Sequence, residues 1–72
     1  MKSIVPRVSL STRERQILNR VLDGEGTTQI AKAMKVSKRT VDTHRANIHR
    51  RMRTQNVAQL MRESVRLGLW AP

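Results

Sequence analysis

The side chains with the most informative chemistry lie between positions 38 and 53. This stretch combines several arginines with short hydroxyl, methyl and amide side chains, and its acid is Asp42. A guanidinium can donate two hydrogen bonds to a guanine edge, an asparagine can bond to adenine, and a threonine or alanine can meet a thymine methyl. If the stretch is one helix, it carries the side-chain types that read base edges in a duplex.

Helical periodicity predicts which of these side chains face outward. Val41, Ile48 and Met52 are spaced i, i+7 and i+11, which places them on one buried stripe. At about 100° per residue, the outward face comprises Arg39, Thr43, Ala46 and Arg50, flanked by Asp42, Asn47 and Arg53. We expect base contacts from Arg39, Asp42, Thr43, Ala46 and Asn47, and phosphate contacts from Lys38, Thr40, Arg50 and Arg53. The alternative is a basic helix that is merely solvated.

Cations in the first turn of this helix need an external partner. Lys38 and Arg39 stand where the helix macrodipole is already positive, so they destabilise the isolated helix. A phosphate reverses that penalty, because it is attracted both by the cations and by the free N–H groups at a helix start. The first turn is therefore a second reason to expect a nucleic-acid partner.

The overall charge also points to an anionic partner. The chain has 15 Lys and Arg against 5 Asp and Glu, a formal net charge of +10 in 72 residues. Nucleic acid and an anionic membrane surface both suit that charge. Trp70 is the single aromatic residue, whereas proteins that bind RNA or single strands stack bases on aromatic rings. Double-stranded DNA fits best; an RNA-binding helical domain and a membrane-surface amphipathic helix are the alternatives.

Other chemistries lack the residues they need. There is no cysteine, which excludes disulfides and cysteine-based zinc sites. His44 and His49 are five residues apart, so they do not share one helix face as a metal-binding pair would, and the 5 acids are scattered. We expect no enzyme activity, metal, cofactor or small-molecule ligand in this domain. The apolar runs are too short for a membrane span or a signal peptide, so the expected partners do not include a membrane and the expected location is the cytoplasm.

Capping signals predict four helices. Ser11 and Glu14 form a capping box, so the first helix begins at about Thr12 and ends near Asp23, before Gly24. The other helices are expected at about 27–34, 38–52 and 57–67, with caps at Gly26 or Thr27, at Ser37 and at Asn56, and with Gly68 ending the last one. Two residues, Lys35 and Val36, separate the second helix from the next cap, and helices joined so closely must cross. The fold class is all-α with helix-turn-helix geometry.

Residues at the edges of these helices have structural interpretations. Residues 1–9 read as a linker or N-terminal arm and residues 10–70 as the domain, and the abrupt start favours a domain detached from a longer protein. His44 borders the buried stripe, where a structural role is favoured over a DNA contact. We expect the stem of Arg45 to pack inward, and the ring of Trp70 to pack on the first or fourth helix rather than on a partner.

Three ordered motifs lie along the chain. They are Leu-Ser-Thr-Arg-Glu-Arg-Gln-Ile-Leu at 10–18, Ile-Ala at 30–31 and Val-Ser-Lys-Arg-Thr-Val-Asp-Thr-His-Arg-Ala-Asn-Ile at 36–48. Together they resemble the LuxR-type helix-turn-helix domain of bacterial transcription regulators, over Leu10 to about Leu69, and the step at 44–47 is most similar to the FixJ branch. The resemblance implies four helices with the third as recognition helix in the major groove, and an output domain that follows a receiver or ligand-binding domain, most often in a two-component response regulator.

The resemblance also assigns individual contacts. It implies that Asp42, Thr43 and Ala46 meet base edges and that Thr27 and Thr28 contact phosphates at the start of the second helix. Many members carry Lys where Asp42 stands, and a carboxylate there repels phosphate and prefers a cytosine amino group.

The fourth helix has a wider apolar arc than one core contact needs. Its centre is expected at Val57 and Leu60, which leaves an edge formed by Ala58 and Val65. The resembling family pairs through this helix, so we expect a weak homodimer contact at that edge, formed mainly on DNA; packing of the edge under Trp70 is the alternative. RNA polymerase is a candidate further partner.

Overall fold

The computed structural model describes residues 9–70. These residues form four α-helices: α1 (Thr12–Leu22), α2 (Thr27–Met34), α3 (Lys38–Met52) and α4 (Val57–Arg66). The predicted all-α class is confirmed, and each helix begins where its capping signal placed it. The arm expected at 1–9 lies outside the described residues except for Ser9, so the boundaries of the domain stay a prediction.

Side-chain caps explain where the helices begin. The Ser11 hydroxyl accepts a hydrogen bond from the Glu14 N–H at 3.1 Å, and the Glu14 carboxylate accepts one from the Ser11 N–H at 3.2 Å, which completes the predicted capping box. Ser37 and Asn56 accept from the third N–H of α3 and α4, at 3.0 and 2.9 Å. Each cap satisfies a donor that the helix itself leaves free, so the starts of three helices follow from local sequence.

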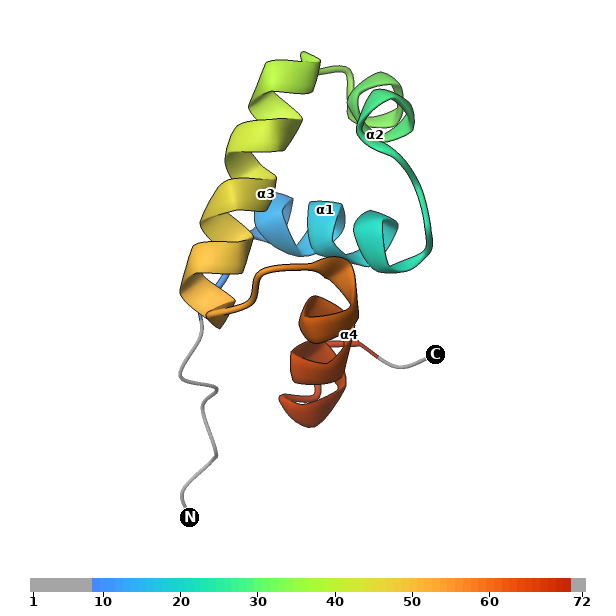
Figure 1. Ribbon diagram of the computed structural model, residues 1–72. Coiled ribbons are helices and arrows are strands. Elements are labelled where there is room, and N and C mark those ends of the chain that lie inside the picture. Colours follow the sequence, from blue (N-terminus) through green and yellow to red (C-terminus); the bar gives the residue numbers. More distant parts are fainter. Residues whose placement is uncertain (1–8, 71–72) are drawn as a thin grey trace.

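The helices pack around α1 (Figure 1). Figure 1 shows α3 running along one side of the molecule, with α2 beside its first turns, α4 towards its other end and α1 crossing behind its middle. The core is formed by apolar side chains from all four helices: Ile17, Leu18, Val21, Leu22, Ile30, Ala31, Val41, Ile48, Met52 and Leu60. The predicted buried stripe of α3 is thereby confirmed, and its opposite face is left to solvent.

The turn between α2 and α3 consists of Lys35, Val36 and the cap residue Ser37. Lys35 adopts a left-handed backbone conformation with φ 58°, and the Val36 N–H donates back to the Ala31 carbonyl at 3.0 Å. This is a helix-ending bond pattern that glycine usually provides. Because the turn is so short, the two helices cross, and the N-terminal end of α2 lies beside the first turns of α3. This is the arrangement that a helix-turn-helix requires.

The fourth helix departs from the sequence expectation at one residue. Leu60 is buried as predicted, but Val57 is 39% exposed and is not part of the core centre. Val57 is the first residue of α4, next to the loop that precedes the helix. Ser64, one turn beyond Leu60, is buried instead. Trp70 is half-buried and packs against the core, as expected.

Candidate nucleic-acid interface

One face of α3 is exposed along its whole length. Val41, Ile48 and Met52 are 0%, 1% and 3% exposed, and they anchor the helix to the core. On the far side of the helix, the exposed stripe consists of Arg39, Asp42, Thr43, Ala46, Arg50 and Arg53, with Asn47 half-buried at its edge. The predicted outward face is therefore the face that the fold leaves free. We call these seven residues the α3 stripe.

The start of α3 carries positive charge without an acid to balance it. Lys38 and Arg39 are exposed in a first turn that has no acidic residue. Thr40 is half-buried, and its hydroxyl lies 3.0 Å from the Ser37 hydroxyl that caps the helix. The remaining free N–H groups and the two cations therefore face the same solvent region, which is suited to an anion.

The start of α2 is tied to the stripe. The Thr27 hydroxyl donates to an oxygen of the Asp42 carboxylate at 3.4 Å, and Thr28 is exposed beside it. Asp42 thus bridges α2 and α3, a contact that the sequence did not indicate. The carboxylate holds the Thr27 hydroxyl at the edge of the stripe. A ligand that bonds to either side chain competes with this hydrogen bond.

Asn47 and Arg50 form a second hydrogen-bonded pair further along the stripe. The Asn47 carbonyl oxygen accepts from the Arg50 guanidinium at 2.9 Å. This contact turns the Asn47 amide so that its NH₂ group is free to donate, and it fixes Arg50 in the last turn of α3, towards the end of the exposed face. The residues predicted to contact bases and phosphates are thus brought together on one surface by α2 and α3.

A buried carboxylate sets the position of α3 against α1. Glu14 is 5% exposed, and its carboxylate accepts from the Arg51 guanidinium at 2.9 Å and lies 3.9 Å from His44 Nδ1. Sequence reasoning found the capping role of Glu14 but not these contacts, because Arg51 is 37 residues away along the chain. The structural role expected for His44 is consistent with this position beside a carboxylate.

His49 is held on the inner side of α3 near its end. Its Nδ1 lies 2.8 Å from the hydroxyl of Thr54, which is buried in the loop after the helix. Burial and the nearby Arg45 guanidinium lower the pKa of His49, although a hydrogen bond with the Thr54 backbone opposes them. The neutral ring is therefore the favoured form in the folded protein.

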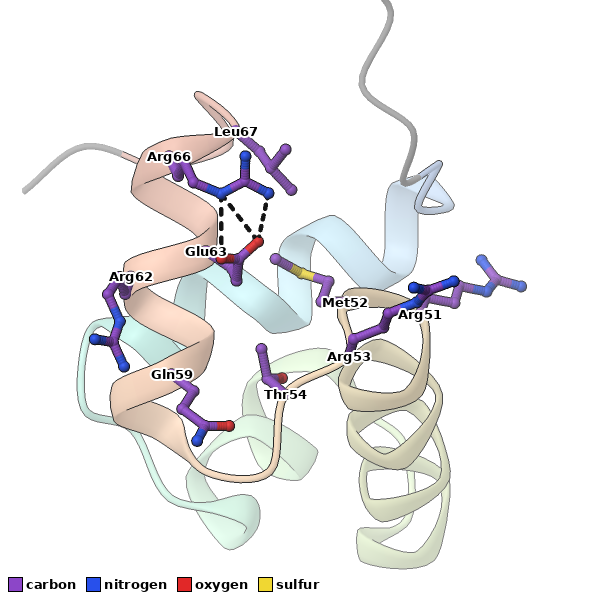
Figure 2. Close-up of a pocket in the computed structure, with 9 residues that line it drawn as sticks. All are labelled: Arg51, Met52, Arg53, Thr54, Gln59, Arg62, Glu63, Arg66 and Leu67. Atoms are coloured by element: carbon purple, nitrogen blue, oxygen red, sulfur yellow. Dashed lines mark hydrogen bonds and ion pairs between the residues drawn. The ribbon is translucent and has the colours of Figure 1, made fainter.

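Sequence reasoning also missed a cleft at the end of α3. Arg51 in the last turn of α3 and Arg53 just after it line one side, and Arg62, Glu63 and Arg66 line it from α4 (Figure 2). The spacing of the two arginines in α4 was visible, but nothing local showed that the end of α3 would lie opposite them.

Comparison with known proteins decides what this arrangement is. The model of the family described as bacterial regulatory proteins, luxR family, matches residues 8–64. The chain belongs to the luxR family. The LuxR-type domain is 35% identical over 69 residues to the transcriptional regulatory protein FixJ of Bradyrhizobium diazoefficiens, covering 94% of this chain and 34% of that protein. It is 38% identical over 63 residues to the transcriptional regulatory protein RcsA of Salmonella typhimurium, covering 88% and 30%.

Solved structures have the same fold. The transcription factor GerE superimposes with a TM-score of 0.79 at 29% identity, over 86% of this chain and 92% of that one. The Vibrio cholera VqmA protein, solved as a ligand–DNA complex, gives 0.80 at 25% identity, over 96% and 30%. The chain is thus a LuxR-type helix-turn-helix DNA-binding domain of transcription regulation, as the motifs implied. It spans about a third of the length of the FixJ and RcsA relatives.

The helices were also compared with the length that a bilayer requires. Within residues 9–70, no helix is long and apolar enough to cross a membrane.

Proposed function

We propose that this domain is the sequence-reading output module of a bacterial transcription regulator of the two-component type, and that it acts by placing α3 in the major groove of duplex DNA. The observation that carries the proposal is the α3 stripe, an exposed helix face of short polar side chains and arginines opposite a fully buried apolar face. The response-regulator names of relatives such as TodT of Pseudomonas putida support the assignment of the whole protein. Because its proposed ligand is bacterial DNA, we infer that the domain acts in the cytoplasm.

The stripe divides into residues that read and residues that position. We assign base contacts to Arg39, Asp42, Thr43, Ala46 and Asn47, and phosphate contacts to Thr27, Thr28, Lys38, Thr40, Arg50 and Arg53. Short side chains at the centre let the helix backbone approach the base edges in a groove about 12 Å wide. Arginines and hydroxyls at the ends meet the phosphates, which fix register but carry no sequence information.

We assign a distinct preference to Asp42. Its carboxylate is an acceptor, so at a base edge it favours the amino group of cytosine and disfavours guanine O6 and N7. The Thr27 hydroxyl, which donates to it at 3.4 Å, keeps the carboxylate at the edge of the stripe. Asp42→Asn is therefore expected to relax the preference for cytosine at one position.

We also propose that two copies pair through α4 when bound to neighbouring half-sites. Val65 is 49% exposed and Ala58 is exposed beside it, on the side of α4 away from the core residues Leu60 and Ser64. An edge of two residues is far smaller than a stable interface, so the free domain stays monomeric at micromolar concentration. DNA supplies the effective concentration that the contact lacks, over half-sites spaced about 10 base pairs apart. RNA polymerase stays a candidate partner.

The experiment begins with selection of bound sites from random duplexes, followed by affinity measurements over a series of salt concentrations. Arg50→Ala should weaken binding to every sequence and reduce the magnitude of the salt slope by about one. Thr43→Val and Ala46→Ser should instead relax preference at one or two base pairs, by about 1 to 3 kcal/mol of discrimination, with non-specific affinity unchanged. Structured RNA and anionic vesicles at matched salt serve as competitors. Equal binding to RNA, or base preferences that shift only in Arg50→Ala, would contradict the proposal.

A further inference from the structure

The cleft at the end of α3, called here the arginine cleft, is a strongly charged concave surface. It has a volume of about 640 Å³ and lies between the end of α3, the loop that follows and the outer side of α4 (Figure 2). Four guanidinium groups line it, on Arg51, Arg53, Arg62 and Arg66, against the single carboxylate of Glu63. The base contacts proposed for α3 assign no role to the two arginines that α4 contributes.

Two of the four guanidinium groups already have acidic partners. Arg66 donates to both oxygens of Glu63, with a shortest distance of 2.7 Å, and Arg51 donates to Glu14 at 2.9 Å. Within residues 9–70, neither Arg53 nor Arg62 has a carboxylate within 4.0 Å, and both side chains are exposed. The charge available to an external anion therefore comes from Arg53, which directly follows α3, and from Arg62, on α4.

Arg53 connects the cleft to the surface that reads DNA. It stands at the end of the α3 stripe and also lines the cleft, so the two surfaces are continuous. The helix has 15 residues, which makes it about 22 Å long, whereas the major groove is about 12 Å wide. A helix that enters the groove with its first turns extends past the groove, and its last turn then comes close to a phosphate backbone. The cleft lies at that end of α3.

We propose that the arginine cleft binds a backbone phosphate of the duplex beyond the base pairs that α3 reads, with Arg53 and Arg62 as the donors. This rests on α3 entering the major groove, as in the proposed function. A guanidinium presents paired N–H groups that match two phosphate oxygens. In Figure 2 the Arg53 and Arg62 side chains lie on opposite sides of the cleft, so a phosphate that binds both draws them towards each other. Glu63 limits the affinity, because its carboxylate repels the phosphate and occupies Arg66.

Charge separates the duplex from other occupants. The segment at 1–8 contains Lys2 and Arg7 and no acid, so it has the wrong sign to fill the cleft. An acidic protein segment has the right sign, but the continuity with the α3 stripe through Arg53 favours the polyanion that the stripe already meets. Arg62 lies beside the dimer edge, because it is four residues after Ala58 and three before Val65 on α4. The phosphate contact is therefore tested on a single half-site, where no dimer contact forms.

The test uses two duplexes that carry the same selected half-site. One ends at the edges of the half-site, and the other extends by about 10 base pairs, one helical turn, on each side. The measured quantity is the slope of the logarithm of affinity plotted against the logarithm of salt concentration. For the full chain with Arg62→Ala, the magnitude of this slope should fall by about 0.9 on the extended duplex and stay unchanged on the short one. Arg13→Ala is the control, because it removes the same charge from an exposed site on α1 that does not line the cleft.

Glu63→Gln provides a change of opposite sign. It removes the repelling charge and frees Arg66, so affinity for the extended duplex should rise and its salt slope should steepen, with the short duplex unaffected. A variant that merely damaged α4 would not bind more tightly, and thermal unfolding followed by circular dichroism checks that both variants fold.

Three results would overturn the cleft proposal. They are an Arg62→Ala slope that is unchanged on both duplexes, a slope that falls equally on both, and an effect no larger than that of Arg13→Ala. A fourth result would show an acidic-protein site instead. In that case polyglutamate binds Arg62→Ala more weakly than the parent, while the salt slopes of the two proteins on DNA are equal. If the parent chain itself selects no half-site, the proposed function fails; if it selects one and Arg62→Ala has no effect, the cleft proposal alone fails.

Discussion

The contact between Glu14 and Arg51 should contribute measurably to stability, because the carboxylate is buried. Glu14 has a side chain 6% exposed and satisfies both the Ser11 N–H and the Arg51 guanidinium, whereas Arg51 is itself 46% exposed. Replacing Glu14 by Ala loses the reciprocal capping bond, about 0.5 to 1 kcal/mol, and the charge-assisted bond from a half-exposed arginine, about 1 kcal/mol. Loss of the buried Cγ methylene adds about 0.8 kcal/mol. We expect a total of about 2 to 3 kcal/mol.

The matched control is Glu25, which pairs with Arg20 at 3.0 Å but in a partly exposed position. Because water screens that pair, Glu25→Ala should cost less than about 1 kcal/mol. Glu14→Gln should fall between the two, since the amide oxygen can still accept from Ser11 and Arg51 but the charge is lost.

The assay is urea unfolding at pH 7, followed by helical circular dichroism. A double-mutant cycle with Arg51→Ala should give a coupling of about 1 kcal/mol, because the two side chains are in direct contact. The reasoning is refuted if Glu14→Ala costs no more than Glu25→Ala, or if the cycle gives no coupling. In the first case, burial of the carboxylate would not strengthen the pair. In the second, the loss would come from the helix cap alone.

Three further changes test other parts of the structure. Ile48→Ala should cost about 2 to 4 kcal/mol by urea unfolding, because Ile48 is 1% exposed at the centre of the core, and a loss below about 1 kcal/mol would contradict the inward face of α3. The lowered pKa of His49 means that protonation favours the unfolded state, so stability present above about pH 6.5 should fall as the pH drops below that value, and less so in His49→Gln; parallel pH curves would show that another group is responsible. Val65→Glu should abolish cooperative binding to paired half-sites while half-site affinity and melting temperature stay near those of the parent; cooperativity that survives would place the dimer contact elsewhere.

Local signals were enough to predict the helices. Ser11, Ser37 and Asn56 each cap a helix through their own side chains, and these bonds depend on residues three positions away. The buried stripe of α3 follows from helical geometry, because the spacing of Val41, Ile48 and Met52 fixes one side of the helix whatever packs against it. The exposed stripe is the opposite side, so its members could be predicted by the same reasoning.

Contacts between helices could not be predicted in this way. The bond from Thr27 to Asp42 and the bond from Arg51 to Glu14 join residues 15 and 37 positions apart, and their formation depends on how α2 and α1 cross α3. Val57 shows the same limit from the opposite direction. Its place on the helical wheel is apolar, but it is the first residue of α4 and is exposed at the end of the helix. Helical periodicity gives the direction of a side chain and not the position of the neighbouring element.

The few acids are placed so that the reading surface keeps its charge. Glu14, Glu25 and Glu63 form ion pairs with Arg51, Arg20 and Arg66, none of which belongs to the α3 stripe. In the part of the chain that the structure describes, Arg39, Arg50 and Arg53 have no carboxylate partner. Asp42 is the acid on the stripe, and the Thr27 hydroxyl occupies it with a neutral hydrogen bond rather than a cation. Self-repulsion among these cations destabilises the free domain, and a polyanion removes that repulsion on binding. The same charge distribution that weakens the fold therefore strengthens its attraction to DNA.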